Sequence, residues 1–297
     1  MTIIKNISLV TFFGLALFFG AAWYFSSTVL HLNITPCNQK HYVFCGDPSE
    51  QGIEFQEVSY ATQDGFTLPA WYMPSKESLK TVLLVHGRGA SRHEGMRYAK
   101  PLLDNGFNVL AIDMRHPRQQ PDIISSMSYH ERKDVYGALD YLQQHTQSES
   151  IGIMGFSMGA ATSIIAMAQD KRINAGIFNS GFANSTDVLA ENAATMYGMP
   201  RNPLMPAVMK LVEMRGDVNT DLINPESYIG AIAPRPVYIM HGNADKTVGF
   251  HHGQRLFAAA NEPKQFWTVE GGEHTRLWQA DRKQAENLVV SFFKKEL

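Results

Sequence analysis

The sequence predicts an α/β protein in which a mostly parallel central sheet carries helices on both faces. Two observations indicate this architecture. Apolar runs of strand length recur along most of the chain, and segments of helix length separate one run from the next. The runs are apolar along their length, which is typical of parallel strands that are covered on both sides. In such a sheet, ligands bind beyond the carboxyl ends of the strands.

The predicted elements follow one another in a regular order. Residues 54–59 and 66–73 are expected to pair as an antiparallel hairpin across Asp64-Gly65. Further strands are predicted near residues 80–86, 107–113, 151–156, 174–179, 236–242 and 265–270. Helices are predicted near residues 91–105, 129–146, 158–169, 249–261 and 276–295. The alternation pauses between Phe182 and Ala233.

One pentapeptide carries chemistry by itself. Directly behind the apolar run 151–154, the chain reads Gly155-Phe156-Ser157-Met158-Gly159. A strand that ends in G-x-S-x-G and turns sharply into a helix holds its serine in a strained conformation, with the hydroxyl above the sheet. Glycine at both flanks leaves room for this turn. The pattern arises by chance in roughly one chain of this length in ten, so the prediction that Ser157 is a nucleophile depends on partners downstream.

Both partners of a serine nucleophile are present in the order that accompanies this turn. A weakly nucleophilic hydroxyl requires a histidine base and a carboxylate that orients the base. The run 236–242 leads into a loop that contains Asp245, and the run 265–270 leads into Gly271-Gly272-Glu273-His274. The chain order serine, acid, histidine matches the elbow arrangement. We therefore predict His274 as the base and Asp245 as the acid.

Other histidines and carboxylates are less well placed. His241 ends its own strand and is expected to be structural. His251 and His252 open a predicted helix with no carboxylate at metal-ligand spacing, so we expect them at the surface. Asp113 and Glu273 are alternative acids, but neither precedes the base by one strand and one helix.

The developing oxyanion requires hydrogen-bond donors, and a second strand end supplies a candidate. The run 80–86 ends in His86-Gly87-Arg88-Gly89. We expect the backbone N–H groups of Arg88 and Met158 to hold the oxyanion. An ordinary glycine turn is the alternative interpretation of this short motif.

Together these residues resemble those of the α/β-hydrolases, and in particular the small membrane-anchored serine hydrolases of the Bem46 and ABHD12/13/17 type. The similarity runs from about Phe55 to the C-terminus and is carried by His86-Gly87, Asp113-x-Arg115, Gly155-x-Ser157-x-Gly159, His241-Gly242-x-x-Asp245 and Gly272-x-His274. The resemblance implies one α/β-hydrolase domain over residues 53–297, in which the insert 183–233 forms a small helical cap over the serine.

The cap insert is rich in methionine. Met196, Met199 and Met205 are expected to contact substrate, because methionine adapts to varied apolar shapes. Packing of the cap onto the body is the alternative role for these side chains.

Residues 1–31 are predicted to be an N-terminal signal anchor. The segment 7–30 contains no charged residue, and as a helix it reaches roughly 36 Å, enough to cross a hydrocarbon core of about 30 Å. A cleaved signal peptide, followed by secretion, is the alternative, because Lys5 precedes the apolar run and Gly20-Ala21-Ala22 offers small residues. The aromatic run Trp23-Tyr24-Phe25 favours an uncleaved anchor. The charge of Lys5 places the N-terminus in the cytoplasm and the catalytic domain outside it, in the periplasm or the extracellular space.

Both cysteines of the chain, Cys37 and Cys45, lie in the predicted linker 32–52. A small disulfide loop is expected in an oxidising compartment, and two reduced thiols are the alternative. Two cysteines and the nearby His41 do not complete a metal site.

The net charge is −2 at neutral pH and the basic residues are scattered, which gives no support for nucleic-acid binding. The sequence therefore predicts a membrane-anchored serine hydrolase that cleaves carboxylic esters or thioesters, acyl lipids among them, through an acyl-enzyme on Ser157. No metal or organic cofactor is expected. The alternatives are a prolyl-oligopeptidase-like peptidase, whose usual propeller the chain lacks, and a non-catalytic membrane-anchored binding protein with the same fold.

Overall fold

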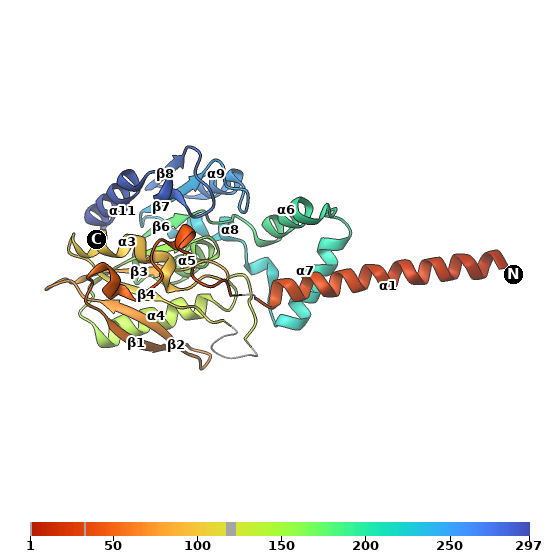
Figure 1. Cartoon of the computed structure of the whole chain (residues 1–297), viewed down its shortest axis with the longest axis horizontal. Helices are drawn as coiled ribbons and strands as arrows, with labels where there is room; N and C mark the ends of the chain where they lie inside the picture. Colours follow the sequence, from red (N-terminus) through yellow and green to blue (C-terminus); the bar gives the residue numbers. More distant parts are fainter. Residues whose placement is uncertain (1, 33, 117–122) are drawn as a thin grey trace.

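In the computed structural model, which describes residues 2–32, 34–116 and 123–297, an eight-stranded sheet forms the centre of the protein (Figure 1). The strands are β1 (Gln56–Ala61), β2 (Thr67–Met73), β3 (Lys80–Val85), β4 (Asn108–Ile112), β5 (Ser150–Phe156), β6 (Ile173–Asn179), β7 (Val237–Gly242) and β8 (Lys264–Val269). Their order in the sheet is β1-β2-β4-β3-β5-β6-β7-β8. β2 is antiparallel to β1 and β4, and the other neighbours are parallel. The predicted mostly parallel sheet is confirmed.

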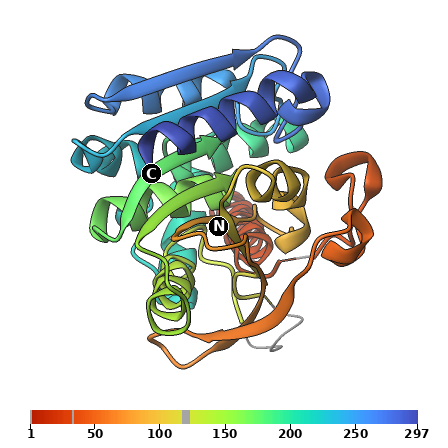
Figure 2. The same ribbon diagram turned by 90° about the vertical axis from the view of Figure 1, so that its left-hand side faces the viewer.

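Helices cover both faces of the sheet, as expected (Figure 2). α4 (Arg132–His145), α5 (Met158–Gln169) and α9 (Phe250–Ala259) contribute to the apolar core on one face. α3 (Met96–Leu103) and α11 (Arg282–Glu296) contribute to the core on the other face. Shorter elements are α2 (Gln39–Tyr42), α8 (Pro225–Ile229), α10 (Leu277–Ala280) and 3₁₀ turns at Pro48–Gln51, Arg92–Gly95, Thr220–Leu222 and Gly230–Ile232.

Two predicted helices are interrupted in the structure. The segment 91–105 begins as a 3₁₀ turn before α3, and the segment 276–295 is divided between α10 and α11. The second break falls at Asp281, whose side chain accepts the N–H of Gln284 at 3.0 Å. This cap satisfies an N-terminal donor of α11 and starts a new helix there.

Close packing of the central strands depends on residue size. Gly152 of β5 lies under the ring of Phe293 from α11, and a Cβ at this glycine would meet two ring carbons at 2.5 and 2.7 Å. Phe293 is fully buried, and so is Ile153, which follows Gly152 in β5. Burial of each such side chain contributes about 1.5–3 kcal/mol, so the sheet is a firm base for the loops at its carboxyl edge.

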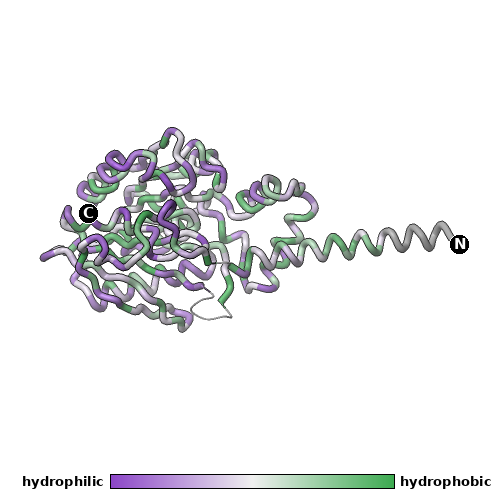
Figure 3. Tube along the Cα trace, viewed as in Figure 1, coloured by the Kyte–Doolittle hydropathy of each residue, from purple (hydrophilic) through white to green (hydrophobic). Residues whose placement is uncertain are grey.

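The cap and the N-terminal helix project from the same side of the body (Figure 1). The insert holds α6 (Ser185–Tyr197) and α7 (Leu204–Gly216), and α1 (Thr2–Leu30) packs along α7. Ala22, Ser26 and Val29 of α1 are buried against the protein, whereas its described apolar residues before Ala22 are mostly exposed. The described part of α1 before the body is largely hydrophobic and extends away from the rest of the protein (Figure 3).

Candidate active site

Ser157 lies between the end of β5 and the start of α5, in a strained turn. Its backbone has φ 52° and ψ −118°, a region that residues other than glycine rarely occupy. A Cβ on Gly155 would overlap the backbone of Gly159 and Ala160, and a Cβ on Gly159 would overlap the carbonyl oxygens at the end of β3. Both glycines of the pentapeptide are therefore required for the close approach of helix and strands.

The loops after β7 and β8 bring Asp245 and His274 to this serine. The Ser157 Oγ lies 2.9 Å from His274 Nε2, and His274 Nδ1 lies 2.7 Å from Asp245 Oδ2. These distances place a hydroxyl, an imidazole and a carboxylate in one hydrogen-bonded line. In sequence, Ser157 and His274 are 117 residues apart, and Asp245 and His274 are 29 residues apart. Such a line transfers a proton from the hydroxyl to the ring and stabilises the charged ring.

Asp245 is held in its ionised form by its surroundings. Burial alone would raise the pKa of its carboxyl group, but the hydrogen bond and the charge of His274 hold the pKa below its ordinary value. Its other oxygen, Oδ1, accepts the backbone N–H groups of Thr247 and Val248, both at 2.9 Å. These two bonds fix the rotamer, so Oδ2 remains directed at the ring.

His241 has a structural position, as the sequence predicts. It is fully buried, and its Nε2 lies 2.8 Å from the Val248 carbonyl oxygen and 3.6 Å from Asp245 Oδ2. Burial lowers the pKa of His241. The neutral ring therefore donates to the loop that carries the aspartate and helps to hold that loop in place.

Glu94 is one of the side chains that hold the loop after β3, and the sequence does not predict this role. Glu94 is buried, and its Oε2 accepts the Gly87 N–H at 2.6 Å. Burial would raise the pKa of Glu94, but the hydrogen bond from His41, the charge of Arg97 and the Gly87 N–H lower it to about 2. No motif marks Glu94 in the sequence, because its role depends on the fold of the loop seven residues before it.

A second support of this loop is His86. Its Nε2 accepts the N–H of Met114 at 2.9 Å, and its Nδ1 donates to the Gly87 carbonyl at 2.7 Å. The ring thus joins the carboxyl ends of β3 and β4. Met158 is the first residue of α5, so its N–H lies among the helix N-terminal donors that have no partner one turn earlier.

A cavity of about 590 Å³ opens beside Ser157 and His274. This volume lies in the range of small-molecule sites. The three methionines of the cap that the sequence singles out, Met196, Met199 and Met205, all line it. Arg88 lines it too. The cavity therefore brings the cap, the serine and the loop after β3 together.

The N-terminal helix also contributes to this site, which its sequence does not predict. Phe25, Thr28 and Val29 of α1 line the same cavity. The apolar run of α1 predicts a membrane span, and no local pattern distinguishes the residues at its end that line this cavity.

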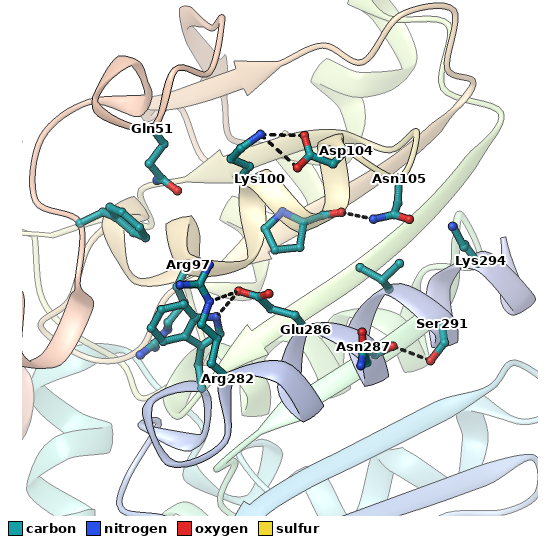
Figure 4. Close-up of a pocket in the computed structure, with 14 residues that line it drawn as sticks. Gln51, Arg97, Lys100, Asp104, Asn105, Arg282, Glu286, Asn287, Ser291 and Lys294 are labelled. Atoms are coloured by element: carbon teal, nitrogen blue, oxygen red, sulfur yellow. Dashed lines mark hydrogen bonds and ion pairs between the residues drawn. The ribbon is translucent and has the colours of Figure 1, made fainter.

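A larger hollow, of about 750 Å³, lies between α3 and α11 (Figure 4). Several of its polar side chains pair with one another, as in Lys100 with Asp104 and Arg282 with Glu286. None of the serine, histidine and aspartate described above lines it. We therefore place the candidate site at the cavity beside Ser157.

His251 lies at the surface as expected, with its side chain 50% exposed, but His252 does not. His252 is buried rather than at the surface, and a carboxylate does accompany the pair: Glu191 of α6 lies 3.0 Å from His251 Nε2 and 3.1 Å from His252 Nε2. The three ligand atoms lie within 4.8 Å of one another. However, His252 Nδ1 accepts the N–H of Ala183 at 3.2 Å, so the neutral ring carries its proton on Nε2 and has no lone pair there for a metal. We interpret the cluster as a polar link between the cap and α9.

The alternative acids point elsewhere. The Glu273 side chain is 61% exposed and pairs with Arg276. Asp113 accepts the N–H of Arg92 at 2.7 Å and so supports the loop after β3. Neither contacts His274 among the described hydrogen bonds and ion pairs.

Cys37 and Cys45 are joined by a disulfide in the structure. The closed loop contains α2. In this helix, the Nε2 atom of His41 lies 3.2 Å from the Thr275 hydroxyl oxygen. The His41 carbonyl also accepts the side-chain amide of Gln279 at 2.6 Å. The disulfide loop thus packs beside the segment that carries His274.

Comparisons with known proteins agree with the fold described above. A model of the alpha/beta hydrolase fold matches residues 80–205. The chain is 25% identical over 231 residues to the uncharacterized protein YqkD of Bacillus subtilis, covering 77% of this chain and 75% of that protein. It is 23% identical over 250 residues to the uncharacterized protein YfhR of Escherichia coli O157:H7, covering 80% and 81%. The solved structure of the Pyrococcus furiosus esterase Pf2001 is similar with a TM-score of 0.71 and 25% identity, covering 90% of this chain and 98% of that one.

Proposed function

Because the chain has the α/β-hydrolase fold, we propose that it is a serine hydrolase that cleaves carboxylic esters or thioesters through an acyl-enzyme on Ser157. The observation that carries the proposal is the hydrogen-bonded line from Asp245 through His274 to Ser157, with steps of 2.7 and 2.9 Å. The similarity to an esterase of the same fold supports the reaction class.

The chemistry follows from this line. As the Ser157 Oγ attacks the ester carbonyl carbon, His274 Nε2 takes the hydroxyl proton, and Asp245 stabilises the charged ring. The N–H groups of Met158 and Arg88 hold the oxyanion. The neighbouring Gly87 N–H is already committed to Glu94, which orients the loop. Collapse of the tetrahedral intermediate breaks the bond to the alcohol or thiol, which leaves with the proton from His274. Water then repeats the sequence and releases the acid.

The size and lining of the cavity support a substrate with an acyl chain longer than acetyl. Each methylene that enters an apolar site contributes up to about 0.8 kcal/mol, so kcat/KM should rise several-fold per two carbons until the cavity is filled. Met196, Met199 and Met205 offer adaptable apolar contacts. We therefore expect a medium-chain ester to be a better substrate than acetate.

α1 anchors this enzyme in a membrane, in the manner of the Bem46 and ABHD12/13/17 group that its motifs resemble. Among the described residues, Thr11–Leu30 is long and apolar enough to cross a bilayer. With Lys5 on the cytoplasmic side, the catalytic domain lies outside the cytoplasm. In cells whose outer barrier has been opened, added protease should digest the domain, and full protection would contradict this topology.

The central test is labelling with a fluorophosphonate probe, together with hydrolysis of p-nitrophenyl esters of graded chain length. Ser157→Ala should lose both labelling and hydrolysis while its circular dichroism is unchanged, because alanine fits the same turn. Loss of the nucleophile costs several powers of ten in rate. Labelling of the alanine variant at the rate of the wild type would refute the assignment, and a profile that peaks at acetate would reject the acyl cavity alone.

A further inference from the structure

The end of the N-terminal helix is part of the wall beside the candidate nucleophile. Phe25, Thr28 and Val29 line the cavity that also contacts Ser157 and His274. Val29 is 6% exposed, and Phe25 is half-buried against the core. We propose that α1 is a specificity-determining wall of the acyl site, and that the substrate is an acyl lipid whose chain enters from the bilayer along α1. This inference rests on the proposed ester hydrolysis.

The wall is fixed to the body and to the cap by two arginines. Arg88, on the loop after β3, donates from its Nη2 to the carbonyl oxygens of Thr28 and Val29, both at 2.9 Å. These carbonyls belong to the last turn of α1, which has no helical partners for them. A guanidinium can satisfy both at once. The loop that offers the oxyanion donor is thereby joined to the anchor.

The second arginine comes from α7 of the cap. Arg215 Nη1 lies 2.6 Å from the Ser26 hydroxyl and 2.9 Å from the Ser27 hydroxyl, and its guanidinium stacks over the Trp23 ring at 3.9 Å. The end of α1 therefore has a defined position relative to both walls of the cavity. A segment held in this way is able to set the length of the chain that fits.

The mouth of the cavity lies where α1 leaves the protein. Met196 and Tyr197 line the cavity and yet are 66% and 57% exposed, which places them at its opening. The Tyr197 ring packs against Phe25 of α1, with centroids 5.3 Å apart. Trp23 and Tyr24 are exposed on α1 nearby. The opening is thus bordered by exposed apolar and aromatic side chains from both the cap and the anchor.

The length of α1 sets the level of the bilayer at this opening. The twenty residues of the helix that follow Lys5 end at Phe25, and at 1.5 Å per residue they span about 30 Å, the thickness of a hydrocarbon core. Trp23 and Tyr24 then lie at the interface, where tryptophan and tyrosine are enriched. A lipid acyl chain in the same leaflet reaches the mouth without crossing water.

The first experiment makes the Val29 side chain in the wall larger or smaller in the full-length protein. Val29→Phe fills the cavity and should move the preferred p-nitrophenyl ester at least two carbons shorter, whereas Val29→Ala should move it longer. Rates are normalised to the enzyme labelled by fluorophosphonate, so a misfolded fraction does not count. Leu17→Phe, on the part of α1 away from the body (Leu17 is 77% exposed), is the matched control and should leave the profile unchanged. If both Val29 variants keep the profile of the wild type, α1 does not bound the acyl chain.

The second experiment tests entry from the bilayer. The protein is placed in phosphatidylcholine vesicles that also carry p-nitrophenyl myristate, or is mixed with separate vesicles that carry the ester. Hydrolysis should be at least tenfold faster when enzyme and ester share a membrane, and equal rates would overturn the route along α1. A wild type that hydrolyses no ester would instead reject the proposed function.

Discussion

Asp245→Asn keeps the shape of the side chain but replaces one accepting oxygen with a donating NH₂ group. In the structure, Oδ1 accepts the N–H groups of Thr247 and Val248 at 2.9 Å, while Oδ2 faces His274 Nδ1 at 2.7 Å. The amide of asparagine must keep its oxygen toward the two N–H groups, because the reverse orientation would set donors against donors. Its NH₂ group then faces Nδ1, which becomes an acceptor. The ring proton moves to Nε2, beside Ser157, and the base is lost.

The expected loss follows from this wrong tautomer. Turnover should fall by roughly 10⁴-fold, as for the corresponding change in a serine protease, which is about 5.4 kcal/mol of activation free energy. The measurement is single-turnover hydrolysis of p-nitrophenyl butyrate, with circular dichroism to verify the fold. Glu273→Gln is the matched control, because that side chain is exposed, and its rate should change less than threefold. A loss below tenfold in Asp245→Asn, or a larger effect in the control, would refute the assignment of the acid.

Three further variants test the supports of the site. The pKa of Glu94 is lowered to about 2, so its carboxylate stabilises the fold above about pH 4.5, and this contribution is lost as the pH falls toward 2. Glu94→Gln should lower the free energy of unfolding at pH 7 by about 3 kcal/mol in urea titrations, and an unchanged acid dependence would contradict this. Gly159→Ala should destabilise the fold by about 3 kcal/mol, because its Cβ overlaps rigid backbone, and a soluble variant with wild-type stability would show that the turn can open. Cys37→Ser with Cys45→Ser should cost about 2.5 kcal/mol for a loop closed over 8 residues, and thermal unfolding with and without reductant measures it.

Much of the site could be predicted from local pattern. Ser157, Asp245 and His274 each follow an apolar run, and parallel strands bring their carboxyl ends to one edge of the sheet. The direction of the chain therefore places three distant loops together before any contact is known. The structure supplies the distances and the rotamers.

The misplacement of His252 has a different cause. Its position at the start of a helix is readable in the sequence, but its contact with Glu191 joins it to the cap, 61 residues earlier in the chain. The same is true of Glu94, whose carboxylate meets the Gly87 N–H only when the loop after β3 is folded. Neither contact produces a periodic pattern in the sequence from which it could be predicted.

The sequence by itself determined the α/β layering, the residues at the strand ends and the apolar character of α1, because each depends on neighbours along the chain. Only the tertiary structure decided that the end of α1 lines the cavity. The same is true of the hydrogen bonds that Arg88 and Arg215, which lie far away in sequence, donate to the last turns of α1. Hydropathy measures how apolar a helix is, whereas the surface that buries one of its faces is assembled from segments far away in sequence. A helix that only spans a membrane and one whose end also lines a cavity therefore look alike in sequence.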